Sequence, residues 1–168
     1  MAAEDVMGVV SAIRQAGISV WLDGGWGVDA LIGEQTRPHD DLDVVIPLLD
    51  AERSIGALAA LGYEVEIDAR PTRLVLANGK GQRIDIHLVA LEPNGNARQI
   101  GAGPGGGDAV YPSGGFLGSG KIAGEQVDCL TPHLLVAHHM GYEPQDKDRH
   151  NVRLLCERFG IPLPAAYR

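Results

Sequence analysis

The chain has 168 residues and a mass of 17.8 kDa, which is enough for one domain that buries a hydrophobic core. Its composition, 45% hydrophobic and 21% charged residues, excludes a disordered chain and a fibrous one. With 14 basic and 22 acidic residues the net charge is −8, which disfavours nucleic acids and anionic membranes as partners and favours cationic or neutral substrates.

Helix and strand signals alternate at the start of the chain. Apolar residues at helical spacing predict an amphipathic helix that ends at Gly17 and covers a sheet. Its expected buried face comprises Val6, Val9, Val10 and Ile13. Residues 18–22 predict a short strand that runs into a tight turn at residues 23–25, and residues 26–32 predict the helix that follows.

The middle of the chain predicts the rest of a mixed sheet. Residues 41–46 alternate as a strand, with Leu42, Val44 and Ile46 expected to face the core. Residues 50–61 have the spacing of a helix, and residues 63–67 predict another strand. A hairpin follows, in which strands 74–77 and 84–89 flank an Asn-Gly dipeptide.

Glycine is concentrated in one segment, Gly101 to Gly120. The segment has too little apolar periodicity for a helix, and it lies between two predicted strands, residues 98–100 and 121–127. We therefore predict that Gly101–Gly120 is a mobile loop at the rim of the site.

The C-terminal part is predicted to be helical. One helix starts at Thr131-Pro132 and runs to Gly141, and a second spans about residues 147–159. No linker separates these helices from the preceding elements. We expect a single domain with a core over residues 1–130 and a helical segment over residues 131–168 packed on it.

The cysteines and the N-terminal residues bear on the compartment. Cys129 and Cys156 form no CxxC pair and are too few for a disulfide framework. The first residues are acidic where a secretion signal would be basic, and no apolar run has the length of a membrane span. We expect a cytoplasmic protein.

Acidic residues recur on one face of two predicted strands. Asp41 and Asp43 lie two residues apart and so share a face, as do Asp85 and His87. A lone Asp-x-Asp is more often an exposed polar strand face, but the second strand allows three carboxylates to converge. Such a group repels itself unless a cation neutralises it, and oxygen ligands beside a phosphate site favour Mg²⁺. The sequence therefore predicts that these carboxylates bind Mg²⁺ and that ATP binds together with the Mg²⁺.

A glycine pair precedes this acidic strand. Gly24 and Gly25 follow a predicted strand and open a helix, where free backbone N–H groups and the helix dipole favour phosphate oxygens. Gly-Gly alone is more often a simple turn. The order of glycine pair, helix, acidic strand and third aspartate is the more specific signal.

These motifs resemble one known family. The run WLDGGWGVDALIGEQTRPHDDLDVVI, with RIDIHLV and HHMGYEPQDKDRHNVRLL further on, resembles the lincosamide and aminoglycoside nucleotidyltransferases, a branch of the DNA polymerase β-like nucleotidyltransferase superfamily. The resemblance is close over residues 21–46 and looser beyond. It implies an α+β fold with a nucleotidyltransferase-type mixed β-sheet flanked by helices. It also implies transfer of AMP from ATP to a hydroxyl of a lincosamide or aminoglycoside, with release of pyrophosphate.

The resemblance also assigns roles. Gly24 and Gly25 would hold the triphosphate, and Asp41 and Asp43 would bind Mg²⁺. Asp85 would be the third carboxylate, either sharing the metal or accepting the proton of the acceptor hydroxyl. These three aspartates are the expected catalytic and metal-binding residues.

Further residues are candidates for binding. Arg37 and Lys147 are expected to contact the nucleotide, although Asn151 follows where relatives have a second aspartate on this helix. His87, Tyr111 and Tyr142 are expected to contact the acceptor.

Several expectations compete with the binding roles. Arg37 could instead be a solvated arginine of the loop. His87, Tyr111 and Tyr142 could instead be ordinary packing residues. We expect His39 to order its loop by a local hydrogen bond, and His138 and His139 to be surface or core residues rather than zinc ligands. Trp21 and Trp26 are expected in the core.

Two alternatives to an antibiotic-modifying enzyme are compatible with the sequence. The first is a nucleotidyltransferase that modifies a protein, as in toxin and antitoxin pairs. The second is a nucleotide- or metal-binding module without turnover, which the three intact aspartates disfavour. Either a monomer or a homodimer is compatible with the sequence.

Overall fold

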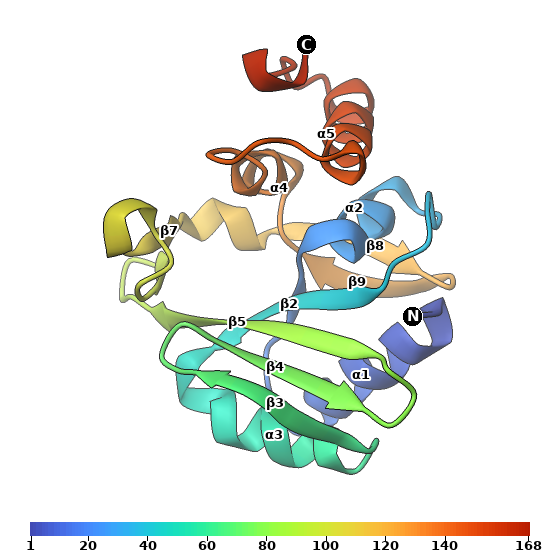
Figure 1. Cartoon of the computed structure of the whole chain (residues 1–168), viewed down its shortest axis with the longest axis vertical. Coiled ribbons are helices and arrows are strands. Elements are labelled where there is room, and N and C mark those ends of the chain that lie inside the picture. Colours follow the sequence, from blue (N-terminus) through green and yellow to red (C-terminus); the bar gives the residue numbers. More distant parts are fainter.

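A computed structural model describes the whole chain, residues 1–168. Its centre is a mixed sheet in the order β3-β4-β5-β2-β1-β9-β8, with β6 and β7 extending from β5 (Figure 1). The strands are β1 (Trp21–Leu22), β2 (Asp41–Pro47), β3 (Tyr63–Ala69), β4 (Arg73–Asn78), β5 (Arg83–Leu91), β6 (Ala97–Gln99), β7 (Ala109–Tyr111), β8 (Gly118–Ile122) and β9 (Glu125–Cys129). Pairs β2–β5 and β1–β9 are parallel and the other pairs antiparallel. This confirms the predicted mixed sheet and α+β class.

Five α-helices flank the sheet: α1 (Ala3–Gln15), α2 (Gly24–Ile32), α3 (Ala51–Ala59), α4 (Pro132–His138) and α5 (Asp146–Phe159). All five confirm helices predicted from apolar spacing and from the Gly and Pro signals that end or start them. In Figure 1, α1 and α3 lie on one side of the sheet, and α4 and α5 lie beyond α2 on the other. None of the helices combines the length and the hydropathy that a membrane span requires.

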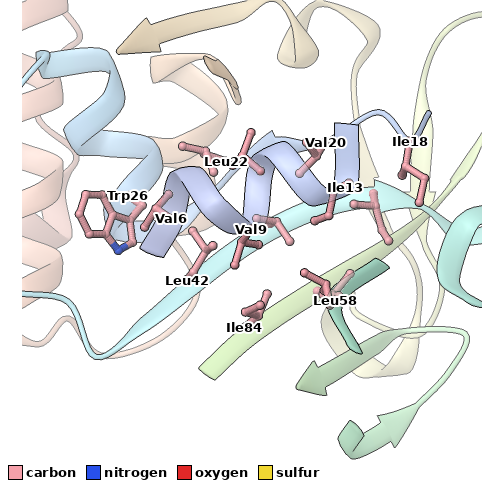
Figure 2. Close-up of a cluster of buried hydrophobic side chains, with 14 of the residues drawn as sticks. Val6, Val9, Ile13, Ile18, Val20, Leu22, Trp26, Leu42, Leu58 and Ile84 are labelled. Atoms are coloured by element: carbon pink, nitrogen blue, oxygen red, sulfur yellow. The ribbon is translucent and has the colours of Figure 1, made fainter. Parts of the chain in front are cut away.

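The first core lies between the sheet and helices α1 and α3. The expected face of α1 is fully buried there against Leu42 of β2 and Ile84 of β5 (Figure 2). Trp26 joins this core from α2 and is 1% exposed, as the sequence predicts. Burial of such large apolar side chains contributes about 1.5–3 kcal/mol each.

A second core joins the other face of the sheet to the C-terminal helices. Val45 of β2 and Val89 of β5 are fully buried and pack in one cluster with Leu135 of α4 and Val152 of α5. The face of β2 that carries Asp41 and Asp43 is therefore polar at one end only and becomes apolar at Val45. The C-terminal helices thus close off the face on which the aspartates lie.

The glycine-rich segment is not the loop without secondary structure that its composition predicts. It contains strand β7, two short 3-10 helices and the start of β8. At Gly118 and Gly120 an added Cβ would lie 2.4 Å and 2.1 Å from the carbonyl oxygens of Cys129 and Ala30. Glycine permits close packing of backbones here, and its frequency says nothing about mobility.

The strand predicted over residues 121–127 is also wrong. The chain reverses at Ala123 and Gly124, both with positive φ, and forms the β8–β9 hairpin instead. Periodicity did not reveal this turn, because β-strand patterns continue on both sides of it.

Candidate active site

The parallel pairing of β2 and β5 sets the geometry of the acidic residues. Its register places Asp43 opposite Asp85 and Val45 opposite His87. Like charges that face each other directly across a sheet are destabilising. The fold nevertheless holds these two carboxylates side by side, which indicates a functional rather than a structural role.

Asp43, Asp85 and His87 form a compact group of candidate metal ligands. One ligand atom of each lies within 4.8 Å of the others. Asp41 lies outside this group, although its exposed side chain lines the same cavity. Of the three aspartates predicted to converge, the structure therefore brings two together and adds a histidine.

The carboxylate of Asp85 has two unlike oxygens. Oδ2 accepts a hydrogen bond from Arg73 Nη1 at 2.7 Å, whereas Oδ1 is buried without a partner. A buried carboxylate oxygen without a donor is costly unless a proton or a cation meets it. An oxygen-rich group with one unsatisfied oxygen fits a hard divalent cation such as Mg²⁺.

Burial and neighbouring charges shift the pKa values in this group. Burial raises the pKa of Asp85 and the charge of Asp43 adds to this effect, while His87 and Arg73 oppose it. Burial alone would lower the pKa of His87. Asp43, whose Oδ1 lies 3.7 Å from His87 Nε2, and the charges of Asp23 and Asp85 outweigh that penalty and raise the pKa to about 9.

The glycine pair forms the first turn of α2, above the acidic group. Asp23 caps the helix by accepting a hydrogen bond from the Gly24 amide at 2.7 Å. Gly24 has a φ of +55°, and an added Cβ would lie 2.0 Å from Asp43 Oδ2. Only glycine lets the helix N-terminus approach Asp43 this closely, and that N-terminus favours phosphate oxygens.

His138 of α4 lies beside this turn, which the sequence did not indicate. Its Nδ1 is 3.2 Å from Asp23 Oδ2, and its ring packs edge-on against Tyr111. Burial would raise the pKa of Asp23, but the hydrogen bond and charge of His138 lower it to about 2. Asp23 was missed as well. Its place directly before Gly-Gly is a helix-cap signal that could have identified it.

A cavity of about 730 Å³ joins these residues. It lies between the acidic strand face, the glycine-rich segment and the C-terminal helices. The predicted site residues that line it are Gly24, Gly25, Arg37, Asp41, Asp43, His87, Tyr111, Tyr142 and Lys147. Asp85 is adjacent through the acidic group but does not line the cavity.

The two candidate tyrosines differ. Tyr111 is 2% exposed, and its hydroxyl donates to Gln99 Oε1 at 2.9 Å, so little of its ring faces the cavity. Tyr142 is 50% exposed and lies at the rim, in the turn between α4 and α5. Tyr142 is therefore the better candidate for an open acceptor wall.

The loop between α2 and β2, residues 33–40, is held by hydrogen bonds to α2 and to α5. His39 Nε2 lies 2.5 Å from buried Asp29, which confirms the expected loop-ordering hydrogen bond. Arg37 Nε donates to Asn151 Oδ1 at 3.3 Å, so the departure at position 151 still contacts this loop. Lys147 is exposed one turn before Asn151 on α5 and forms no salt bridge.

The chain is similar to known antibiotic-modifying proteins. A lincosamide resistance protein of Staphylococcus haemolyticus is 30% identical over 138 residues, covering 82% of this chain and 84% of that protein. A 2''-aminoglycoside nucleotidyltransferase of Escherichia coli is 29% identical over 174 aligned positions, covering 95% and 91%. The crystal structure of the lincosamide antibiotic adenylyltransferase LnuA with lincomycin bound is 27% identical, has a TM-score of 0.79 and is matched over 90% of this chain and 94% of that chain.

The family model for aminoglycoside-2''-adenylyltransferase matches residues 5–155, nearly the whole chain. That span includes the α2 turn, the acidic strands β2 and β5, and most of α5. The chain belongs to the aminoglycoside-2''-adenylyltransferase family and is a nucleotidyltransferase.

Proposed function

We propose that the protein transfers AMP from ATP to a hydroxyl of a lincosamide, releases pyrophosphate and depends on Mg²⁺. The observation that carries this proposal is the pairing of Asp43 with Asp85 directly beneath the N-terminal turn of α2. A carboxylate that can hold a cation, a carboxylate that can accept a proton and a helix end that binds phosphate are thereby brought to one place.

The nucleotide would lie along the α2 turn. The N-terminal turn of α2 with Gly24 and Gly25 would face the triphosphate; the Gly24 amide already donates to Asp23, so the Gly25 amide is the remaining donor of the pair. Arg37, whose guanidinium lies against Gly25, and Lys147 of α5 line the same cavity. Asp43 would hold Mg²⁺ with Asp41, whose exposed side chain is free to turn toward it. When bound, Mg²⁺ would offset the negative charge that develops on the α-phosphate.

Asp85 is the proposed general base. Its buried Oδ1 has no partner, and burial raises its pKa, which suits acceptance of a proton. The acceptor hydroxyl oxygen forms a bond to the α-phosphorus, the bond to pyrophosphate breaks, and the hydroxyl proton passes to Asp85. Arg73 holds the other oxygen and so fixes the orientation of the carboxylate.

The cavity favours a lincosamide over a polycationic aminoglycoside. Its rim is apolar or weakly polar, formed by Ala102, Pro104 and Ala109 on one side and by Met140 and Tyr142 on the other. Two of the five aspartates that line it have hydrogen-bond partners, with Asp23 beside His138 and Asp148 accepting the Gln145 amide, whereas Asp40 and Asp41 are exposed. An acceptor with about one positive charge and a large apolar face matches this lining better.

The test is a panel of lincosamides and aminoglycosides incubated with ATP and Mg²⁺, followed by mass spectrometry. We expect the mass of one AMP group on a lincosamide, and none with Asp43→Asn. Adenylylation of aminoglycosides alone would reject the lincosamide assignment. If labelled ATP instead labels a protein in a cell lysate and no antibiotic is modified, the target is a protein. If no pyrophosphate is released with any acceptor, the chain is a nucleotide- or metal-binding module without turnover.

A further inference from the structure

Asn151 of α5 is a buried amide in the wall of the cavity that no step of the proposed reaction uses. It lines the cavity and is 2% exposed. Its Oδ1 accepts a hydrogen bond from Arg37 Nε at 3.3 Å, and its Nδ2 lies 3.3 Å from His139 Nε2. Both ends of the amide therefore have a partner, as expected of a buried polar side chain that fixes the geometry of its neighbours.

Arg37 sets the orientation of this amide. A guanidinium N–H can only donate a hydrogen bond, so the amide atom that faces Arg37 Nε is the oxygen. The NH₂ group then faces His139. This direction suits the ring, because the other ring nitrogen of His139 lies 2.7 Å from the Leu135 carbonyl oxygen, to which it donates.

The guanidinium of Arg37 is held beside the α2 turn at three points. Nε donates to Asn151, and Nη1 donates to the Pro38 carbonyl oxygen at 3.0 Å. Nη2 lies against the turn, since a Cβ added at Gly25 would be 2.6 Å from it. The cavity is lined by two arginines, of which Arg73 forms a salt bridge with an aspartate and Arg37 forms none.

This arrangement leaves the charge of Arg37 to a ligand. Asn151 and Pro38 offer oxygens without a net charge, so they fix the direction of the guanidinium and do not neutralise it. Gly25, whose amide is the remaining donor of the glycine pair, lies against Nη2. A guanidinium and a backbone N–H side by side match the oxygens of a phosphate chain.

We propose that Asn151 is a positioning residue for the nucleotide, and that its amide oxygen holds the Arg37 guanidinium against the α2 turn, where it meets the triphosphate. The inference rests on the proposed function, because it takes ATP as the ligand of this turn. Asn151 acts through Arg37, so its effect on nucleotide affinity depends on the presence of the guanidinium.

The test is a double-mutant cycle in the full-length protein. Calorimetric titration with Mg²⁺ and a non-hydrolysable ATP analogue gives the affinity. We expect Arg37→Gln and Asn151→Leu each to weaken analogue binding about tenfold, as loss of a charge-assisted phosphate contact requires. Combined, they should weaken it little more than Arg37→Gln alone, because both remove the same contact. A structural role of Asn151 would instead weaken binding by the same factor with and without Arg37, and that result would overturn the proposal.

Asn151→Asp is the matched conservative variant. Its carboxylate keeps an oxygen for Arg37 Nε and has nearly the same shape, so we expect analogue affinity within about threefold of wild type. Affinity as low as that of Asn151→Leu would show that the contact with Arg37 is not what the amide contributes.

A measurement on the wild type covers the case in which Asn151→Leu does not fold. Nitrogen-15 NMR of arginine-labelled protein should show an Nε–H of Arg37 that exchanges slowly with solvent, and Arg37→Gln assigns this signal. Exchange as fast as that of the exposed arginines would mean that the hydrogen bond to Asn151 is not formed, and would overturn the proposal.

Binding of the analogue needs no acceptor, which separates this inference from the proposed function. Coupling between Asn151 and Arg37 in a protein that modifies no lincosamide would remove the proposed acceptor and keep the inference. Analogue binding in wild type without that coupling would remove the inference alone. A wild type that binds no analogue with Mg²⁺ present would reject both.

Discussion

Asp43 and Asp85 lie opposite each other on two neighbouring strands, yet their proposed roles differ: Asp43 binds the cation and Asp85 accepts the proton. Asp43 lies against Gly24 at the phosphate end, whereas Asp85 is half-buried, with Oδ2 accepting a hydrogen bond from Arg73 and Oδ1 buried without a partner. We expect Asp43→Asn to lose binding of Mn²⁺, the paramagnetic probe for Mg²⁺, and to lower kcat by at least about 10³-fold, as removal of several kcal/mol of charge stabilisation requires.

Asp85→Asn separates the base from the metal ligand. We expect a comparable loss of kcat, because the proton acceptor is removed, but Mn²⁺ affinity within about threefold of wild type, because Asp41 and Asp43 remain. Titration of Mn²⁺ by its EPR signal and pyrophosphate release measure the two quantities on the same samples. Equal loss of Mn²⁺ affinity in both variants would make Asp85 a ligand instead of the base.

Asp23 predicts a dependence of stability on pH. Its pKa is lowered from 3.8 to about 2 in the folded protein, so the folded state binds its proton less readily than the unfolded state. The stabilisation is therefore present above about pH 4 and is lost as pH falls through 2. Its size is about 2 kcal/mol, from 1.36 kcal/mol per pKa unit.

Asp23→Asn is the matched variant, because asparagine caps helices about as well as aspartate. We expect urea unfolding to show that it costs about 2 kcal/mol at pH 5 and much less at pH 2.5. A cost that does not change with pH would mean that packing, and not the pair with His138, is what the substitution disturbs.

At the scale of elements, β8 depends on glycine to approach α2. A Cβ at Gly120 would lie 2.1 Å from the Ala30 carbonyl oxygen, and backbone cannot move aside as a flexible side chain can. We expect Gly120→Ala to lower the free energy of unfolding by about 3 kcal/mol or more. Gly114→Ala is the control, because Gly114 has no atom within 4 Å of an added Cβ, and its cost should stay within about 0.5 kcal/mol.

These glycines mark where prediction from sequence fails. Helix α1 and strands β2 and β5 were predictable because their buried apolar residues recur at fixed intervals, about every 3.6 residues in the helix and every second residue in the strands. The role of Gly120 depends on α2, which lies some ninety residues away in sequence. Composition therefore suggested mobility where the fold uses close packing.

The site shows the same division. Asp41, Asp43 and the glycine pair were predictable because each lies within one local motif. The roles of Asn151 and His138 could not be found, because they come from contacts with Arg37 and Asp23 that only the tertiary structure creates. Sequence spacing also grouped Asp41 with Asp43 and Asp85, whereas the β2–β5 register places only Asp43 opposite Asp85.

At the scale of the whole molecule, the C-terminal helices complete the fold. Val45, Val89 and Leu130 are fully buried in the cluster shared with α4 and α5. A chain truncated after residue 130 exposes this apolar surface, so we expect it to lack a cooperative thermal transition and to bind a hydrophobic dye. A cooperative transition in the truncated chain would show that residues 1–130 are an independent domain.

The cavity is lined by residues of the sheet, the α2 turn and α5, so ligands bound in it should raise the free energy of unfolding of the whole chain. Two carboxylates facing each other repel without a cation, and a triphosphate next to them adds further negative charge. Mg²⁺ should thus increase the affinity for nucleotide, and by reciprocity nucleotide should increase the affinity for Mg²⁺. With each at about 100 times its Kd, each contributes about 2.7 kcal/mol, so the two together contribute at least about 5.4 kcal/mol, which raises Tm by roughly 10–20 °C. We expect differential scanning fluorimetry with Mg²⁺ and a non-hydrolysable ATP analogue to show a rise larger than the sum of the separate shifts. In Asp43→Asn this excess should vanish while any shift from the analogue alone persists, and an additive response in wild type would place cation and nucleotide at separate sites.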